Sequence, residues 1–404
     1  MIAVGCDWAR EAHQFVVLSS SKEELACFSV PHSAQGLAEI ARRLEALEPD
    51  ASQVRVAIEG HDGPLMDWLE DQGYVVFSVN PKASNAARNL VSSGGSKDDK
   101  LDAQALAQVV LLDAPRIVQR AKPQHNRRSL ALLLRQRERR VEERGDLLRR
   151  LGQILQEWAP TVAALCTDLG LVWTRQFVGR WPLEQDVVAA DPRTLRAFVA
   201  KHPLRGSTRQ RILDARRARP MPIRPERLAL LRHEIQFLLA QLETVLAEIQ
   251  SLEEALTCLV ESDPAHPVLS TLPGTSIVTE AAWLAALAHT PPDCSDWRSV
   301  ASHVGVSPVT RASGSARGVH LRRSRDPMLQ RLLTYHAFQT SRIGGCWAHR
   351  MYHAKRARGQ KHYTTLRGIA QRWVKIVHAM TRNHTPYQER ASQDPQEQRL
   401  RNAA

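Results

Sequence analysis

The sequence is poor in aromatic residues and has no closely spaced cysteines. Phe, Trp and Tyr make up 5% of its 404 residues, so a hydrophobic core must rest on Leu, Val, Ile and Ala. The six cysteines include no Cys-x-x-Cys pair, which indicates neither a zinc site nor a disulfide framework and predicts reduced thiols in a cytoplasm. No run of about 18 apolar residues occurs, and no basic region precedes an apolar stretch at the N-terminus. We therefore expect no transmembrane helix and no signal peptide.

Acidic residues are scarce in one region of the chain. Lys and Arg total 55 against 42 Asp and Glu, a formal charge of +13, and only 9 of the 55 are lysines. Residues 298–382 hold 17 of these basic residues and a single acid, Asp326, so the rest of the chain is slightly acidic. A solvated face explains any one charge run, but a segment with almost no counter-charges repels itself. We predict that this segment contacts nucleic acid.

The hydrophobic pattern of residues 1–122 alternates between strand and helix periods. The expected strands are Ile2–Asp7, Gln14–Ser19, Glu24–Val30, Val54–Glu59 and Tyr74–Val79, and the expected helices are Ala34–Leu47, Pro64–Gln72, Lys82–Val91 and Asp99–Leu112. The order βββαβαβα predicts an α/β domain in which helices pack on a mixed sheet. It is the order of the ribonuclease H fold.

Helical periods dominate the remainder. An Arg-rich helix is expected over 126–158, followed by a less regular stretch to about residue 225. A heptad seam over 228–259 then predicts a coiled coil, which can pair with another subunit or with the Arg-rich helix of the same chain. After a break at 263–267 the chain is mostly helical. The expected divisions are 1–122, 123–262, 263–385 and a frayed polar tail, 386–404.

Four acidic side chains occupy positions where they can meet. Asp7 and Glu59 end the first and fourth expected strands, and Asp99 and Asp102 share one face of a helix. Converging carboxylates need a hard cation, so the pattern predicts a Mg²⁺ site, with Mn²⁺ as a substitute, suited to phosphoryl displacement. Asp98 competes with Asp99, and spacing alone does not choose. Taken singly, each acid is explained as a strand end or a helix cap, but the ordered set argues against that.

Five segments resemble blocks of the DEDD insertion-sequence recombinases, the bridge-RNA-guided transposases. They are AVGCDWAR around Asp7, VRVAIEG around Glu59, VVFSVNP at 75–81, SKDDKLDAQALA at 96–107 and SHVGVSPVTRASGSARG at 302–318. The resemblance covers both ends of the chain and is weak over about 160–225. It implies a RuvC-like N-terminal domain of the Holliday-junction resolvase type and a C-terminal transposase domain. Its D-x-x-D-A pattern selects Asp99 over Asp98.

Ser313 has two interpretations. From residue chemistry alone, a serine in an Arg-flanked Ser-Gly-Ser turn is a phosphate-contacting loop residue, because no adjacent base activates it. The resemblance implies instead that Ser313 is the nucleophile and that Ser315 is not. Arg311 and Arg317 flank the pair and are expected to steady the scissile phosphate. Arg322, Arg323 and Arg325 are further expected contacts to nucleic acid.

Two other features in the C-terminal third leave alternatives open. Residues 271–277 resemble a helix-hairpin-helix turn, whose backbone N–H groups bind phosphate. Ser276 replaces the usual second glycine, so the turn either grips DNA or only packs. Four aromatic residues interleave with the basic ones, and we expect most of them in the core and one or two to stack on unpaired bases. They are Trp347, Tyr352, Tyr363 and Trp373.

Three functions fit these patterns. The resemblance implies a transposase that cuts and rejoins donor and target DNA through a covalent phosphoserine, guided by a structured noncoding RNA. It further implies a homo-oligomer, a dimer or tetramer for which the heptad seam is the expected joiner, acting at the nucleoid in a bacterial cytoplasm without membrane contact. The alternative is a metal-dependent, resolvase-like endonuclease with water as the nucleophile. A non-catalytic nucleic-acid scaffold is the third, and the ordered acids argue against it.

Overall fold

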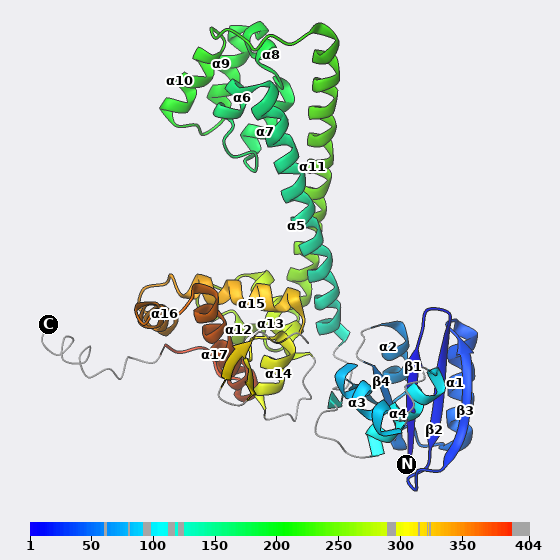
Figure 1. Ribbon diagram of the computed structural model, residues 1–404. Helices are drawn as coiled ribbons and strands as arrows, with labels where there is room; N and C mark the ends of the chain where they lie inside the picture. Colours follow the sequence, from blue (N-terminus) through cyan, green and yellow to red (C-terminus); the bar gives the residue numbers. More distant parts are fainter. Residues whose placement is uncertain are drawn as a thin grey trace, which may run out of the picture. The chain divides into compact units, whose positions relative to one another are not determined.

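The computed structural model describes residues 1–59, 63–79, 81–91, 98–111, 118–119, 125–288, 296–313, 316–320, 322 and 325–389. The chain separates into two compact units, which Figure 1 shows as ribbons. The first comprises Met1–Ala131 and Val260–Ala404, and the second is Leu132–Leu259. The finer boundaries at 122, 262 and 385 stay a prediction. In the part that the structure describes, no helix combines the length and hydrophobicity needed to span a membrane.

A mixed sheet with strand order β3-β2-β1-β4-β5-β6 forms the N-terminal part of the first unit. Its strands are β1 (Ile2–Trp8), β2 (Ala12–Leu18), β3 (Glu24–Pro31), β4 (Val54–Glu59), β5 (Val75–Val79) and β6 (Val118–Gln119). β1 pairs antiparallel with β2 and parallel with β4, and β4 is parallel to β5. The predicted mixed sheet is confirmed. The two-residue strand β6, antiparallel to β5, was not expected.

Helices cover both faces of this sheet. They are α1 (Ala34–Leu47), α2 (Pro64–Asp71), α3 (Pro81–Val91) and α4 (Asp99–Leu111). α1 and α2 pack on one face, where Val4 and Ile58 meet Leu44 and Leu69 in one core cluster. α4 packs on the other face directly over β1, because a side chain at Gly5 would overlap the backbone of Ala103. This close approach places the start of α4 beside the end of β1 (Figure 1).

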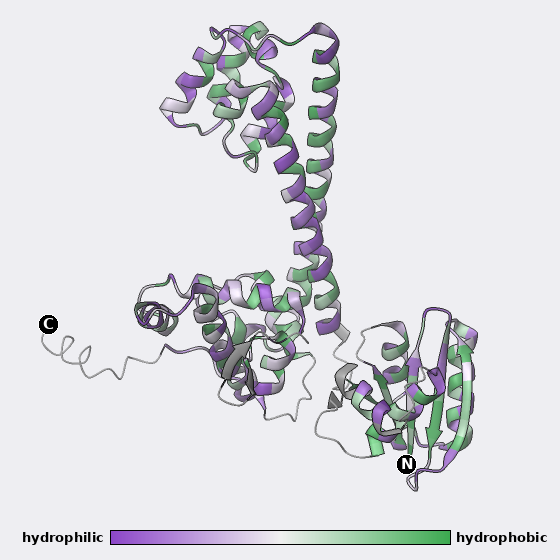
Figure 2. Cartoon of the chain, viewed as in Figure 1, coloured by the Kyte–Doolittle hydropathy of each residue, from purple (hydrophilic) through white to green (hydrophobic). Residues whose placement is uncertain are grey.

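The second unit is a helical hairpin with a helical head. α5 (His125–Trp158) and α11 (Pro225–Glu261) form its arms and lie side by side (Figure 1). The hydropathy colouring of Figure 2 shows many hydrophilic residues along α5, as its Arg-rich sequence requires. The stretch predicted as less regular forms instead five short helices: α6 (Pro160–Leu165), α7 (Val172–Arg180), α8 (Glu184–Ala189), α9 (Pro192–Lys201) and α10 (Gly206–Ala215).

The heptad seam of α11 is buried within its own chain. Leu238, Leu242 and Ile249 of α11 share a core cluster with Leu151 and Leu155 of α5. Two ion pairs run across the same arms, from Arg137 to Glu253 (2.8 Å) and from Arg150 to Glu234 (3.4 Å). The seam therefore pairs with the Arg-rich helix of the same chain. The expectation that it joins subunits is corrected, because α5 already covers its leucines.

The C-terminal part of the first unit is mostly helical, as expected. Its elements are α12 (His266–Leu269), α13 (Ile277–Leu287), α14 (Trp297–Val304), β7 (Val309–Ser313), β8 (Ala316–His320), α15 (Pro327–Thr340), α16 (Trp347–Ala357) and α17 (His362–Asn383). The beginning of the tail is held rather than frayed, since the Tyr387 N–H donates to Thr271 Oγ1 (2.8 Å) and Glu389 accepts from the Trp347 N–H (2.8 Å). Residues 390–404 lie outside the described part.

Truncating the seam tests its intrachain pairing. Leu242 is 1% exposed, so Leu242→Ala should lower the free energy of unfolding by about 2–5 kcal/mol. Leu230 lies on the same helix and is 69% exposed, so Leu230→Ala should change it by less than about 0.5 kcal/mol. Urea unfolding followed by circular dichroism measures both. A concentration dependence of the midpoint that Leu242→Ala abolishes and Leu230→Ala keeps would show that the seam joins subunits instead.

Candidate active site

Two neighbouring parallel strands and one helix carry the four predicted acids. β1 and β4 are in register from Ile2 opposite Val54 to Cys6 opposite Ile58. Asp7 and Glu59 are the next residues of these two strands, so they lie side by side at the same edge of the sheet. Asp99 is the first residue of α4, and Asp102 lies one turn further along. The close contact between α4 and β1 at Gly5 brings this turn of the helix toward Asp7.

The charges of these side chains act on one another. The pKa of Asp7 is raised to about 6, first by burial and then by the negative charges of Asp102, Asp99 and Glu59, while Arg88 lowers it. Like charges disfavour ionisation only when they are near. The structure thus brings all four predicted acids into one electrostatic cluster, which we call the acid cluster.

Arg88 is a member of this site that the sequence analysis missed. It lies in the last turn of α3 and forms an ion pair with Asp102. Asp102 is only 5% exposed, so its charge would be costly to bury without a cation beside it. The available signal was a lone arginine in the helix that precedes D-x-x-D, but the pairing of α3 with α4 is a tertiary contact.

Asp98 caps the start of α4. Its carboxylate accepts a hydrogen bond from the Lys100 N–H (3.1 Å), and its carbonyl accepts one from the Asp102 N–H (3.0 Å). Asp98 is not among the charges that raise the pKa of Asp7, whereas Asp99 is. The geometry is that of a helix cap and leaves Asp99 as the neighbour of Asp7.

The acid cluster has the donor chemistry for a hard divalent cation. Its candidate ligands are all carboxylate oxygens, which suit Mg²⁺ or Mn²⁺, and a buried oxygen of Asp102 forms an ion pair with Arg88. As the side chains stand, the described residues contain no group of three acids, histidines or cysteines close enough to hold one ion. A bound cation therefore requires these carboxylates to turn toward it.

Ser313 ends β7 and pairs with Ala316 of β8. Arg311 and Arg317 lie on the same β-hairpin, opposite Gly318 and Ala312. The predicted Ser-Gly-Ser turn thus falls where β7 joins β8, and five backbone pairs hold the residues on either side of it. The side chains of Ser313, Arg311 and Arg317, and all of Ser315 and Arg323, lie outside the described part.

Arg325 has an internal role in addition to the nucleic-acid contact predicted for it. Its guanidinium donates to Gln330 Oε1 and to the Arg322 carbonyl, both at 2.8 Å. Its aliphatic part lies against Gly305, where a side chain would collide with it. Gly305 has a φ of +82°, so glycine is required on both counts. Arg325 thereby fastens the segment after β8 to the end of α14. Arg322 is half-buried.

The turn at 271–277 packs onto α15. His336 is fully buried and donates from Nε2 to the Pro273 carbonyl (3.0 Å), and Gly274 (φ +65°) lies against the side chains of Gln339 and Thr340. Ser276, in place of the usual glycine, caps α13 by accepting from the Thr279 N–H (3.4 Å). The packing role is confirmed, and phosphate binding by this turn stays a prediction.

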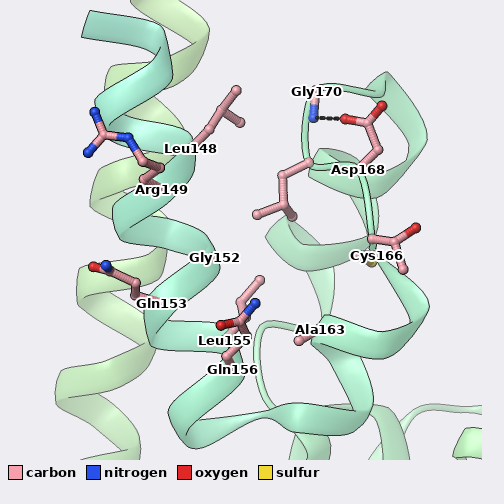
Figure 3. A pocket seen from close by; sticks show the side chains of 12 residues that line it. Leu148, Arg149, Gly152, Gln153, Leu155, Gln156, Ala163, Cys166, Asp168 and Gly170 are labelled. Carbon is pink, nitrogen blue, oxygen red and sulfur yellow. Dashed lines mark hydrogen bonds between the residues drawn. The ribbon is translucent and has the colours of Figure 1, made fainter.

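A cavity of about 570 Å³ lies in the second unit, between α5 and the segment that joins α6 to α7 (Figure 3). Gln153 and Gln156 of α5 are among its lining residues, and Cys166 and Asp168 line it from the joining segment. Burial raises the pKa of the Cys166 thiol to about 12, so it is not a reactive thiolate. Asp168 accepts from the Gly170 N–H (2.8 Å). The cavity contains none of the predicted catalytic residues.

Comparison with known proteins matches both ends of the chain. A family model described as a transposase, of the DEDD IS110 type, matches residues 4–160, which include the acid cluster. A second, described as the transposase IS116/IS110/IS902 family, matches residues 266–353, which include Ser313. Together they cover more than half of the chain. The chain belongs to this transposase family.

Three relatives agree with this family. A putative transposase, y4uE, of Sinorhizobium fredii is 27% identical over 209 residues, 50% of this chain and 56% of that protein. The mini-circle putative transposase for IS117 of Streptomyces coelicolor is 25% identical over 401 residues, 94% of each chain. An uncharacterized protein of insertion element IS110, also from S. coelicolor, is 30% identical over 157 residues, 38% of each. Transposases of this family cleave and join DNA.

Removing one charge from the acid cluster should stabilise the metal-free protein. At pH 7 the Asp7 carboxylate is ionised and repelled by the neighbouring acids. Asp7→Asn removes this repulsion and should raise the free energy of unfolding by about 1–2 kcal/mol, a value that allows for solvent screening of a half-exposed group. Because the pKa of Asp7 rises from 3.8 to about 6 on folding, the penalty grows between these two pH values and is absent below pH 3.8. Thermal unfolding with a chelator at pH 7 and pH 3.5 measures the difference. Glu45→Gln, an exposed acid on α1, is the control, and an equal gain there would contradict the assignment.

Proposed function

We propose that this protein is the transposase of a mobile insertion sequence and that it cuts and rejoins DNA through the acid cluster and Ser313. The observation that carries the proposal is the convergence of Asp7, Glu59, Asp99 and Asp102 at one edge of the sheet, in a chain whose family matches include both this edge and the Ser313 hairpin. The four carboxylates would hold one or two Mg²⁺ ions. When bound, the metal neutralises their charge and polarises the scissile phosphate.

The chain's own groups then perform the strand exchange. The Ser313 hydroxyl oxygen attacks the phosphorus and loses its proton, the phosphodiester bond to the leaving sugar breaks, and that sugar oxygen takes up a proton. A phosphoserine link conserves the energy of the broken bond. Attack by the hydroxyl of a second strand reverses these steps and releases the serine. Arg311 and Arg317 carry positive charge on the same hairpin, suited to the phosphate oxygens.

A guide RNA extends the proposal. A structured noncoding RNA would pair with donor and target DNA, and the protein would contact its backbone and shape more than its base sequence. The supporting observation is the cationic segment 298–382, with 17 Lys and Arg and one acid. A homo-oligomer, dimer or tetramer, would be built through surfaces other than the α11 seam. Action at the nucleoid of a bacterial cytoplasm belongs to the same proposal.

The second candidate is a metal-dependent, resolvase-like endonuclease. The metal-binding acids would be the same, water would be the nucleophile, and Ser313 would contact DNA. Its specific support is the pairing of β1 and β4, which brings Asp7 and Glu59 together without any contribution from the residues around Ser313. The two candidates differ in one product, since only a serine nucleophile leaves protein attached to DNA.

Substituting the serine separates them. Ser313→Ala and Asp7→Ala should each abolish strand transfer while nucleic-acid affinity stays within about threefold, because the cationic segment is untouched. Ser315→Ala is the matched control and should retain transfer. The measurement is the protein–DNA adduct that survives boiling in detergent, with strand-transfer products on a sequencing gel. Strand transfer by purified Ser313→Ala, or cleavage by the unaltered protein without any adduct, would establish water as the nucleophile.

Metal binding has a readout that does not depend on activity. Mg²⁺ at about 100 times its dissociation constant should stabilise the unaltered protein by about 2.7 kcal/mol, seen as a rise in the melting temperature. Asp102→Asn removes a proposed ligand and should abolish most of this rise, whereas Glu45→Gln should keep it. An equal rise in all three proteins would place the ion elsewhere.

A further inference from the structure

Two exposed tyrosines stand out in a chain that has few aromatic residues. Tyr335 on α15 is 55% exposed and Tyr363 on α17 is 71% exposed. The other aromatic residues that were expected to divide between core and stacking are more enclosed, since Trp373 is fully buried and Trp347 packs on it (4.9 Å between ring centroids). Of the four residues expected to divide between core and stacking, Tyr363 is thus the one whose ring is exposed enough to stack on a base. Tyr335, which was not among those four, is exposed in the same way.

Two further rings connect these tyrosines. Ring centroids are 6.3 Å apart from Tyr335 to Phe338, 6.1 Å from Phe338 to His362 and 4.9 Å from His362 to Tyr363. We call these four residues the aromatic strip. It runs from α15 to the first turn of α17 within the first unit. The tyrosines at its two ends are exposed, and the two rings between them are half-buried.

The strip is fixed in place before any ligand arrives. The hydroxyl of Tyr335 accepts from Gln339 Nε2 (2.7 Å), and His362 Nδ1 lies 2.9 Å from the Tyr352 hydroxyl. Beneath the strip, α15 is anchored by the buried residues next to Tyr335, and α17 by its buried residues from Thr365 onward. Rings that are already ordered lose little conformational entropy when a second ring stacks on them.

The surroundings of the strip are cationic. Between Asp326 and Glu389 the sequence contains no acidic residue and eleven Lys and Arg. The Arg342 guanidinium lies over the Phe338 ring at 5.6 Å, Lys361 is exposed next to His362, and Arg367 is half-buried one turn beyond Tyr363. Exposed aromatic rings interleaved with cations, without acids, match a ligand that has flat apolar bases and a phosphate backbone.

We propose that the aromatic strip binds unpaired nucleotides of a single strand. Bases would stack on Tyr335 and Tyr363, and Arg342, Lys361 and Arg367 would contact the flanking phosphates. The proposal rests on the nucleic-acid binding part of the proposed function and not on Ser313 or the metal. RNA and DNA share the stacking and phosphate chemistry, so the experiment includes both. In either case the strip would hold bases that are outside a duplex, where their faces are accessible.

The test compares single strands with duplexes of the same length. Fluorescence anisotropy of the full-length protein would use fluorescein-labelled oligo(dT), oligo(rU) and a blunt DNA duplex. The variant is the double substitution Tyr335→Ala/Tyr363→Ala. It should weaken binding to at least one single strand by about tenfold or more, leave duplex affinity within about twofold, and leave the salt dependence of binding unchanged because no cation is removed. The more weakened of the two single strands identifies RNA or DNA as the ligand.

Two controls separate stacking from folding. Tyr335→Phe/Tyr363→Phe keeps both rings and should retain single-strand affinity within about threefold. Phe237→Ala removes a 50% exposed ring on α11, in the other unit, and should have no effect. Equal losses for duplex and single strands, or no loss for either, would overturn the proposal. So would a change in oligomer size in the Ala double variant with single-strand affinity intact, because the strip would then be a subunit contact.

The outcome is distinguishable from a failure of the proposed function. Ser313→Ala should bind the single strands as the unaltered protein does, since its hairpin is not part of the strip. If no protein–DNA adduct forms but the Ala double variant loses single-strand binding, the recombinase mechanism fails and the strip stands. If the adduct forms and single-strand binding does not depend on the tyrosines, the strip fails and the mechanism stands.

Discussion

Repulsion among the carboxylates at the edge of the N-terminal sheet is the constraint on which the rest of this structure depends. Burying Asp7 and placing it near three other acids costs free energy, as the raised pKa of Asp7 shows. The fold maintains the arrangement with apolar packing away from the acids. Gly5 lets α4 settle on β1, and the buried residues of β1, β4 and α4 hold these elements at fixed separation. The acids are thus close because their backbones cannot move apart.

Arg88 shows how the chain responds to this repulsion without a metal. Its ion pair with Asp102 places a monovalent cation beside one of the four carboxylates. A divalent ion carries more charge in less volume and can be shared by several carboxylates, so it would compete with Arg88 for Asp102. The same arginine lowers the pKa of Asp7, so it acts on two of the four carboxylates.

The parts of the fold that local sequence patterns determine were predictable, and those that depend on distant partners were not. Helix α1 has the predicted bounds because Ser33 caps it and apolar residues recur at helical spacing. The seam of α11 predicted an apolar face, but periodicity specifies a face and not the partner that covers it. β6 has two residues and no pattern of its own. The ion pair of Arg88 joins two helices, and nothing local distinguishes that arginine from an exposed one.

The same reasoning applies to the candidate site. The four acids could be selected from sequence because strand ends and an i, i+3 spacing are local features, and parallel pairing of β1 with β4 then brings two of them together. Whether a given arginine of the cationic segment is available to nucleic acid was beyond the sequence. Arg325 belongs to the run of basic residues, yet its guanidinium bonds to Gln330 and to the Arg322 carbonyl.

Opposite charge in the two halves of the first unit has a consequence for catalysis. A metal-free acid cluster attracts any cation of the same chain, as it does with Arg88, and a cationic segment attracts any phosphate. A phosphate can approach four carboxylates only after metal has reversed the local charge. Under the proposed function, the cationic segment would therefore supply most of the affinity for nucleic acid. Metal at the acids would admit only the one phosphate that reacts there.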